Sequence, residues 1–293
     1  MPIPKSFTYL VVDVFTQRAL EGNPLAVFPD AHGLDDATMQ RIARELNLSE
    51  TVFVFPPTQP EYAASLRIFT PARELPFAGH PTIGTAFALL REGKLPEQHA
   101  SFVFEEQIGP VPVRIEAGTS PLIWLTTPPI HYGPTRSREL CARALGLTPD
   151  DLLPPDPHIL SVGNPTILVP VKSAGLVDRA WLELAGLQEM RGDYPDPICA
   201  FVFAPTPEGA YSRMFAPDYG IAEDPATGSS TGPLAAYMLR HNLLPIDKRT
   251  AFVSEQGTKM GRRSFLHVRI ASEEQAIDVG GYTAPFSRAV MQL

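Results

Sequence analysis

Glu50 has the residue type and the surroundings of a general acid or base. It follows a predicted helix and leads directly into the aromatic run Thr51–Phe55. A carboxylate beside aromatic side chains is partly desolvated, and desolvation raises its pKa toward neutrality, where proton transfer is efficient. A solvent-facing glutamate at a strand edge is the simpler alternative on local sequence alone.

His80 and Asp224 are further candidates, and each lies at or before a glycine-rich stretch. The positive end of a helix favours a neutral imidazole, so His80 could orient a substrate or shuttle a proton. Asp224 could act on a substrate, or it could cap backbone N–H groups. For each side chain taken alone, a structural or capping role is the more common outcome.

The two glycine-rich stretches, Gly79–Gly84 and Thr227–Gly232, each open an apolar helix. A helix N-terminus leaves backbone N–H groups unpaired and carries a partial positive charge, and glycine and serine let an anion approach closely. Pro81 and Pro233 are predicted near the starts, where a missing N–H costs nothing. Two such starts at one cleft could bind a carboxylate or stabilise an enolate formed by proton abstraction. The alternative is that the glycines only permit tight turns between strand and helix.

The sequence segments that must position these residues occur twice in the chain, as an internal repeat. Three motifs recur about half of the 293 residues later: Gly22–Pro24 as Gly163–Pro165, Phe53–Phe55 as Phe201–Phe203, and Phe69–Pro71 as Phe215–Pro217. Ile198 precedes the second Phe-Val-Phe run where Glu50 precedes the first. A repeated scaffold with one carboxylate predicts a site with a single acid/base.

Predicted strands outnumber predicted helices and do not alternate with them regularly, which indicates an α+β fold. The length and the repeat predict two lobes, residues 1–127 and 128–293, with the last ~15 residues packing back on the N-terminal lobe. We expect each lobe to wrap a barrel-like sheet around the helix that follows its glycine-rich stretch. The predicted linker spans residues 127–135. The predicted helices span 37–46, 138–145 and 232–240, and one more follows Gly79.

Composition excludes several classes of partner. The net charge is −8 and no block of Lys or Arg stands out, so neither nucleic acid nor an anionic membrane is an expected partner. No run of about 18 apolar residues is present, so no membrane span is expected. Met1–Leu10 lacks the pattern of a signal peptide, and Cys141 and Cys199 are distant in sequence, so we expect a cytoplasmic protein with reduced structural thiols.

Motifs for cofactor or metal chemistry are missing from the sequence. It contains no HxH, HExxH or CxxC pattern, no GxSxG elbow, and no nicotinamide, flavin or pyridoxal fingerprint. The sequence therefore predicts neither a metal nor a cofactor.

Several ordered motifs together resemble the PhzF family of phenazine biosynthesis-like proteins, over nearly the whole chain. The motifs are Val12–Thr16 with Gly22–Val27, Leu48–Thr51, Arg67–Pro71, Glu74–Pro81, Glu223–Ser229, Gln256–Gly257 and Met260–Arg262. One departure is Arg263, where that family more usually has a proline, and we interpret it as a loop variation.

The resemblance implies the diaminopimelate epimerase-like fold, with two similar lobes and a cleft between them. It also implies isomerisation of a small anionic metabolite without a cofactor, with Glu50 moving the proton. Supporting roles carry over to His80 and Asp224, and substrate-binding roles to Ser49, Gly79, Gly228 and Ser229. A homodimer is implied by the resemblance only.

Two other functions stay open. Epimerases and racemases of the wider superfamily carry a cysteine at each helix start, whereas the comparable positions here are Gly79 and Thr227, so two-base inversion of an amino acid is disfavoured. A non-catalytic metabolite-binding protein is the third hypothesis, and the presence of both Glu50 and His80 disfavours it.

Overall fold

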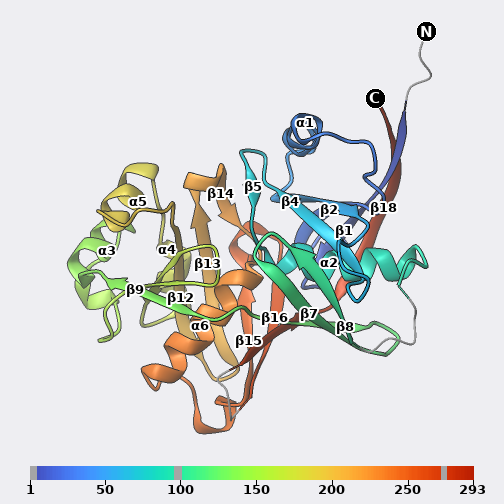
Figure 1. The fold of residues 1–293 in the computed structure, drawn as a ribbon. Helices are drawn as coiled ribbons and strands as arrows, with labels where there is room; N and C mark the ends of the chain where they lie inside the picture. Colours follow the sequence, from blue (N-terminus) through green and yellow to red (C-terminus); the bar gives the residue numbers. More distant parts are fainter. Residues whose placement is uncertain (1–4, 96–100, 272–275) are drawn as a thin grey trace. The chain divides into compact units, whose positions relative to one another are not determined.

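The protein is described by a computed structural model covering residues 5–95, 101–271 and 276–293 (Figure 1). It divides into two compact units. The first unit contains the chain up to Thr126 together with Gly280–Leu293, and the second unit contains Thr127–Val279. Among the described residues, no helix combines the length and the apolarity that crossing a bilayer requires.

The first unit is a sheet whose strands surround one long helix. Its elements are β1 (Ser6–Val14), β2 (Asn23–Phe28), α1 (Asp36–Leu46), β3 (Glu50–Phe55), β4 (Ala64–Phe69), β5 (Glu74–Leu75), α2 (Gly79–Arg91), β6 (Ser101–Glu106), β7 (Gly109–Glu116), β8 (Leu122–Thr126) and β18 (Thr283–Gln292). Strand β1 lies between β18 and β2 and is antiparallel to both. Strand β3 runs parallel to β2, β4 antiparallel to β3, and β6 parallel to β4.

The second unit repeats this pairing. Its strands and helices are β9 (His131–Thr135), α3 (Arg138–Ala144), β10 (His158–Ser161), β11 (Thr166–Pro170), α4 (Ala174–Arg179), α5 (Leu184–Arg191), β12 (Cys199–Thr206), β13 (Gly209–Ala216), β14 (Ile221–Asp224), α6 (Gly228–Arg240), β15 (Ala251–Gln256), β16 (Ser264–Ile270) and the first three residues of β17 (Ile277–Gly281), whose last two belong to the first unit. Short 3₁₀ turns lie at Pro149–Asp151, Pro217–Tyr219, Ile246–Lys248 and Thr258–Met260. Strands β11 and β12 are parallel, β13 is antiparallel to β12, and β15 is parallel to β13.

The strand register corrects one detail of the repeat predicted from sequence. Glu50 pairs with the residue two places after Asn23, and Cys199 pairs with the residue two places after Asn164. The structural counterpart of Glu50 is therefore Cys199 and not Ile198. Matching the two Phe-Val-Phe runs shifts the alignment by one residue, and along a strand one residue reverses the face on which a side chain lies.

The central helix α2 is buried on nearly all sides, as its apolar sequence predicts. It packs closely on the sheet because Gly84 lacks a side chain. A Cβ there would lie 2.6 Å from Leu25 Cδ2 and 2.7 Å from Val14 Cγ2. In the second unit, Gly232 gives α6 the same freedom, since a Cβ would lie 2.7 Å from Thr127 Cγ2.

Most predicted elements are confirmed, including the helix at 37–46, which begins one residue earlier. Asp35 caps it by accepting a 2.7 Å hydrogen bond from the backbone N–H of Thr38.

Two predictions for the second unit were wrong. Helix α6 begins at Gly228, four residues before the predicted start, so Pro233 lies inside the helix and not at its first turn. Burial of the whole first turn outweighs the low helix propensity of glycine and serine there. The second half of the predicted linker forms β9, which pairs with β10. This strand contains a glycine and a proline, two residues that are uncommon in strands, so the sequence did not indicate it.

Candidate active site

Glu50 and His80 meet inside the first unit. Glu50 is the first residue of β3 and is 8% exposed, while His80 is the second residue of α2 and is 4% exposed. The Nε2 atom of His80 lies 3.2 Å from Oε2 of Glu50. The local sequence left a solvent-facing glutamate open for Glu50, and the structure instead places this carboxyl group in the interior.

Asn23 fixes which nitrogen of His80 carries the proton. The Asn23 side-chain amide donates a hydrogen bond to Nδ1 of His80 over 3.2 Å, so Nδ1 is an acceptor. The neutral ring then has its N–H at Nε2, on the side of Glu50. Burial lowers the pKa of His80 to about 3, so the ring is neutral near neutral pH, the state predicted from its place at a helix start.

This pair can perform acid–base chemistry. His80 Nε2 and Glu50 Oε2 lie close together without forming a hydrogen bond to each other, and the imidazole itself stays uncharged. Beside the pair, Gly79 is the buried first residue of α2, and the N-cap residue Ala78 supplies no side-chain cap. Ser49 is half-buried and immediately precedes Glu50.

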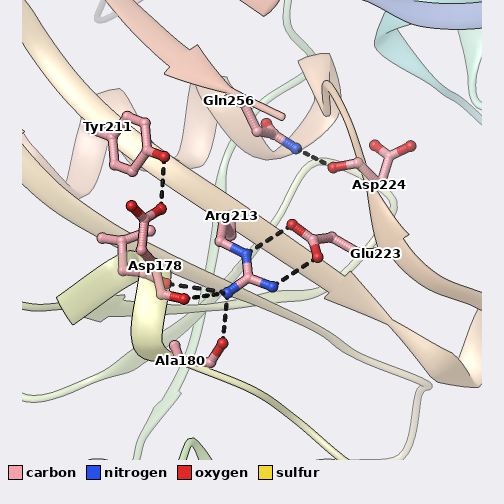
Figure 2. Close-up of polar contacts among 8 residues, drawn as sticks. Asp178, Ala180, Tyr211, Arg213, Glu223, Asp224 and Gln256 are labelled. Carbon is pink, nitrogen blue, oxygen red and sulfur yellow. Dashed lines mark hydrogen bonds and ion pairs between the residues drawn. The ribbon is translucent and has the colours of Figure 1, made fainter. Parts of the chain in front are cut away.

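A second polar cluster lies within the second unit, at the start of α6. Asp224 ends β14, is 4% exposed, and accepts a hydrogen bond on Oδ2 from the Thr227 hydroxyl. Gln256 connects the same residues: its Oε1 accepts from the Thr227 N–H over 3.1 Å, and its Nε2 donates to the Asp224 carbonyl over 2.7 Å (Figure 2). Gly228 and Ser229 are the first two residues of α6, and both are buried. Asp224 thus bonds to the side-chain hydroxyl of the N-cap residue of α6, and not to a backbone N–H group as the capping hypothesis had it.

Arg213 anchors the strand end that carries Asp224. Its Nε and Nη2 atoms each donate to the Glu223 carboxylate over 2.8 Å, and Nη1 donates to the Ala180 carbonyl over 2.6 Å (Figure 2). Arg213 is 8% exposed. Because Glu223 immediately precedes Asp224, this two-pronged ion pair fixes the position of β14 where it approaches α6.

The predicted residues therefore form two groups, each inside one unit. Three residues that complete these groups were not assigned roles from sequence, although signals existed for two of them. Asn23 belongs to the repeated Gly-Asn-Pro motif, and Gln256 belongs to the Gln-Gly motif quoted above. Thr227 was considered only as a possible base position in epimerases and not as a hydrogen-bond partner of Asp224.

No group of three or more His, Cys, Asp or Glu side chains within the described ranges could hold a metal ion. Cys141 and Cys199 are both buried and unbridged. Burial raises the pKa of the Cys141 thiol to about 12, which keeps it protonated and unreactive.

A repeated sheet around a central helix, with a buried Glu–His pair at one helix start, defines a protein of the diaminopimelate epimerase-like fold. Residues 12–289 match the family model described as phenazine biosynthesis-like protein. The chain is 38% identical over 287 residues to trans-2,3-dihydro-3-hydroxyanthranilate isomerase of Pseudomonas aeruginosa, covering 95% of this chain and 97% of that protein.

Two solved structures support the same family assignment. A PhzF-family protein of Bacillus anthracis superimposes with a TM-score of 0.86 at 26% identity, covering 99% of this chain and 100% of that one. A predicted epimerase from Pseudomonas aeruginosa superimposes with a TM-score of 0.84 at 34% identity, covering 97% and 99%. The chain belongs to the PhzF family of phenazine biosynthesis-like proteins, and it is an isomerase.

Proposed function

We propose that this isomerase moves one proton within a small carboxylate-bearing metabolite, that Glu50 is the only acid/base, and that no cofactor takes part. The observation that supports this proposal most strongly is the contact between Glu50 and the neutral His80. A carboxyl group that is only 8% exposed, with the Nε2 atom of a neutral imidazole 3.2 Å away, is sheltered from water beside a group that can assist proton transfer.

The proposed reaction needs no electron acceptor or donor. The Glu50 carboxylate takes a proton from one substrate carbon, and the electrons of that C–H bond enter the adjacent conjugated system as an enolate-like anion. The Glu50 acid then returns the proton to a different carbon, so a double bond changes position and the atoms balance. His80 keeps Glu50 oriented and remains neutral in both steps.

We propose that Asp224 and the first turn of α6 contribute to the same reaction. Support comes from the repeat. Counted from the N-cap, Gly228 of α6 corresponds to Gly79 of α2, and Ser229 corresponds to His80. N–H groups at such helix starts suit an anionic substrate, and this is the role proposed for Gly79, Gly228 and Ser229.

The first substrate to test is trans-2,3-dihydro-3-hydroxyanthranilate, because the Pseudomonas aeruginosa relative is named for its isomerisation. The experiment incubates this compound with the protein in D₂O and follows both product formation and deuterium uptake by NMR. Glu50→Gln removes the acid/base with little change in shape, and the loss of a general base is expected to lower the rate by about 10²–10⁴-fold.

Glu45→Gln is the matched control, since Glu45 is an exposed residue near the end of α1. It should keep the wild-type rate and the wild-type deuterium uptake. Turnover by Glu50→Gln at the wild-type rate, with deuterium still entering the product, would show that another group moves the proton.

A second candidate is an epimerase, favoured by the description given to the solved Pseudomonas aeruginosa structure. Stereoinversion by two bases requires an ionisable group at both helix starts. The N-cap residues here are Ala78 and Thr227, followed by Gly79 and Gly228, and none of these side chains can act as a base near neutral pH. Loss of optical activity of a chiral amino acid during incubation would support the epimerase. Tight calorimetric binding of a metabolite that is never converted would instead support a non-catalytic protein.

A further inference from the structure

Glu106 is a buried carboxyl group that contacts the start of α2. It is the last residue of β6 and is 5% exposed. Its Oε1 lies 2.6 Å from the hydroxyl of Thr82, and the backbone N–H of Ala78 also donates to the carboxyl group. Ala78 and Thr82 enclose the first turn of α2, which contains Gly79 and His80.

The contacts of Thr82 indicate the protonation state of Glu106. The Thr82 hydroxyl oxygen lies 2.8 Å from the Ala78 carbonyl and 2.6 Å from Glu106 Oε1. A hydroxyl has one hydrogen to donate, and the carbonyl can only accept. Both contacts are hydrogen bonds together only when Thr82 donates to Ala78 and Glu106 donates to Thr82, which requires Glu106 to be the neutral acid.

The repeat places a neutral side chain at the same position in the second unit. Glu105 pairs with Ser65 of β4, and Glu255 pairs with Tyr211 of β13. The next residue along each strand is therefore equivalent, so Glu106 corresponds to Gln256.

Gln256 interacts with the N-cap residue of α6, as Glu106 does with that of α2, whereas Thr231, the counterpart of Thr82, donates to the Thr227 carbonyl. The Oε1 atom of Gln256 accepts from the N–H of Thr227, which is the N-cap residue of α6, and its Nε2 donates to the Thr227 hydroxyl over 3.0 Å. A glutamine amide and a protonated glutamic acid both present one acceptor oxygen and one donor. In the second unit, the side chain that bonds to the N-cap residue of the central helix is therefore one that cannot ionise.

Burial is the main influence on Glu106. It raises the pKa of Glu106 to about 8, against the hydrogen bonds from Thr82 and Ala78, which lower it. The neighbouring elements also carry ionisable side chains. These are His80 and Arg91 on α2, Glu105 on β6, Arg67 on β4 with its ion-pair partner Glu74 on β5, and Arg114 and Glu116 on β7. His80 is neutral, and Glu105 is occupied by hydrogen bonds from Thr58.

We propose that Glu106 is a positioning residue for the isomerase reaction, held as a neutral acid that fixes the first turn of α2. In this form it orients Gly79 and His80 and leaves the positive potential of the helix start available to an anionic substrate. Ionisation of Glu106 would place a negative charge at that helix start and break one of the two Thr82 contacts. The proposal rests on the proposed function, because it assigns Glu106 a role in that reaction.

The test compares wild type with Glu106→Gln, which copies the residue of the second unit. With trans-2,3-dihydro-3-hydroxyanthranilate as substrate, wild-type kcat/KM should fall about tenfold between about pH 7 and pH 9 as Glu106 ionises. Glu106→Gln should match wild type at about pH 7 and should lack this decline. Glu105→Gln, at the half-buried neighbour on the same strand, is the matched control and should decline as wild type does.

A second measurement does not depend on turnover. The backbone amide signals of Gly79 and Thr82 should shift in ¹H–¹⁵N NMR spectra of wild type over this pH range and should stay constant in Glu106→Gln. If the substrate is not converted, the proposed function fails while these signals still decide the role of Glu106. Identical pH dependence of the amide signals in both proteins would overturn the proposal, as would a large loss of activity in a correctly folded Glu106→Gln variant at about pH 7.

Discussion

Replacing Gly84 with alanine should destabilise the first unit and slow the reaction. The added Cβ would lie 2.6 Å from Leu25 Cδ2 and 2.7 Å from Val14 Cγ2, whereas ordinary van der Waals contacts begin at 3.4 Å. Both neighbours are 0% exposed, so neither side chain has open space into which to move. The helix must therefore shift away from the sheet by several tenths of an ångström.

Two opposing effects set the size of the change in stability. Overpacking a dense core costs about 1–3 kcal/mol. Alanine favours a helix over glycine by about 1 kcal/mol, which offsets part of this cost. We expect overpacking to prevail, with a net loss of up to about 2 kcal/mol in the free energy of unfolding.

The shift also reaches the active site, because His80 lies one turn before Gly84 in the same helix. A displacement approaching 1 Å between catalytic groups can cost about 10²-fold in rate, so kcat should fall more than the loss of stability alone implies. Urea denaturation measures the first effect, and steady-state kinetics measures the second.

Gly175→Ala is the control, because Gly175 lies in α4 and a Cβ there would have no heavy atom within 4 Å. This variant should be as stable as wild type or slightly more stable. If Gly84→Ala were equally stable and fully active, the close approach of α2 to β1 and β2 would not be the reason for glycine at this position.

Two further predictions concern buried ionisable groups. Because the pKa of Glu106 rises from 4.5 to about 8 on folding, its contribution to stability is complete below the unfolded value and is lost as the pH rises toward the folded value. Wild type should therefore lose about 3 kcal/mol relative to Glu106→Gln between about pH 5 and pH 7.5, measured by urea denaturation at both pH values, and a constant difference would contradict the buried acid. Arg213→Lys should cost about 2–4 kcal/mol and lower kcat, because lysine cannot form the two-pronged contact with Glu223. The repeat supplies its control: the Arg67 side chain is 29% exposed against 10% for that of Arg213, so Arg67→Lys should cost clearly less, and equal losses would contradict a role for burial.

Elements were predicted correctly from sequence where hydrophobic periodicity and residue propensity both favour the observed structure. The helix predicted at 37–46 differs from α1 by a single residue at its start, since apolar residues at helical spacing have few alternatives. The start of α6 was missed because glycine and serine have low helix propensity, and only burial against the sheet makes that turn helical. Tertiary packing decided this case, and packing is not visible in a local pattern.

The active-site residues show the same division. Glu50 and His80 were each identified from their local context, but their contact depends on how α2 packs against β2 and β3. Glu106 was overlooked because Glu105 and Glu106 are adjacent acidic residues, which usually indicate a solvated surface. In a strand, neighbouring side chains lie on opposite faces, so Glu106 is enclosed while Glu105 is only half-buried.

The comparison of the two units also bears on the proposal that one of them carries the acid/base. Both retain the arginine–glutamate pair before the central helix and a side chain that bonds to its N-cap residue. These contacts fix a helix start and are required by the fold in each unit. The position of Glu50 is occupied by Cys199 in the second unit, so this position is not fixed by the fold. A carboxylate that costs free energy to bury, at a place where the scaffold accepts an apolar thiol, is better explained by chemistry than by stability.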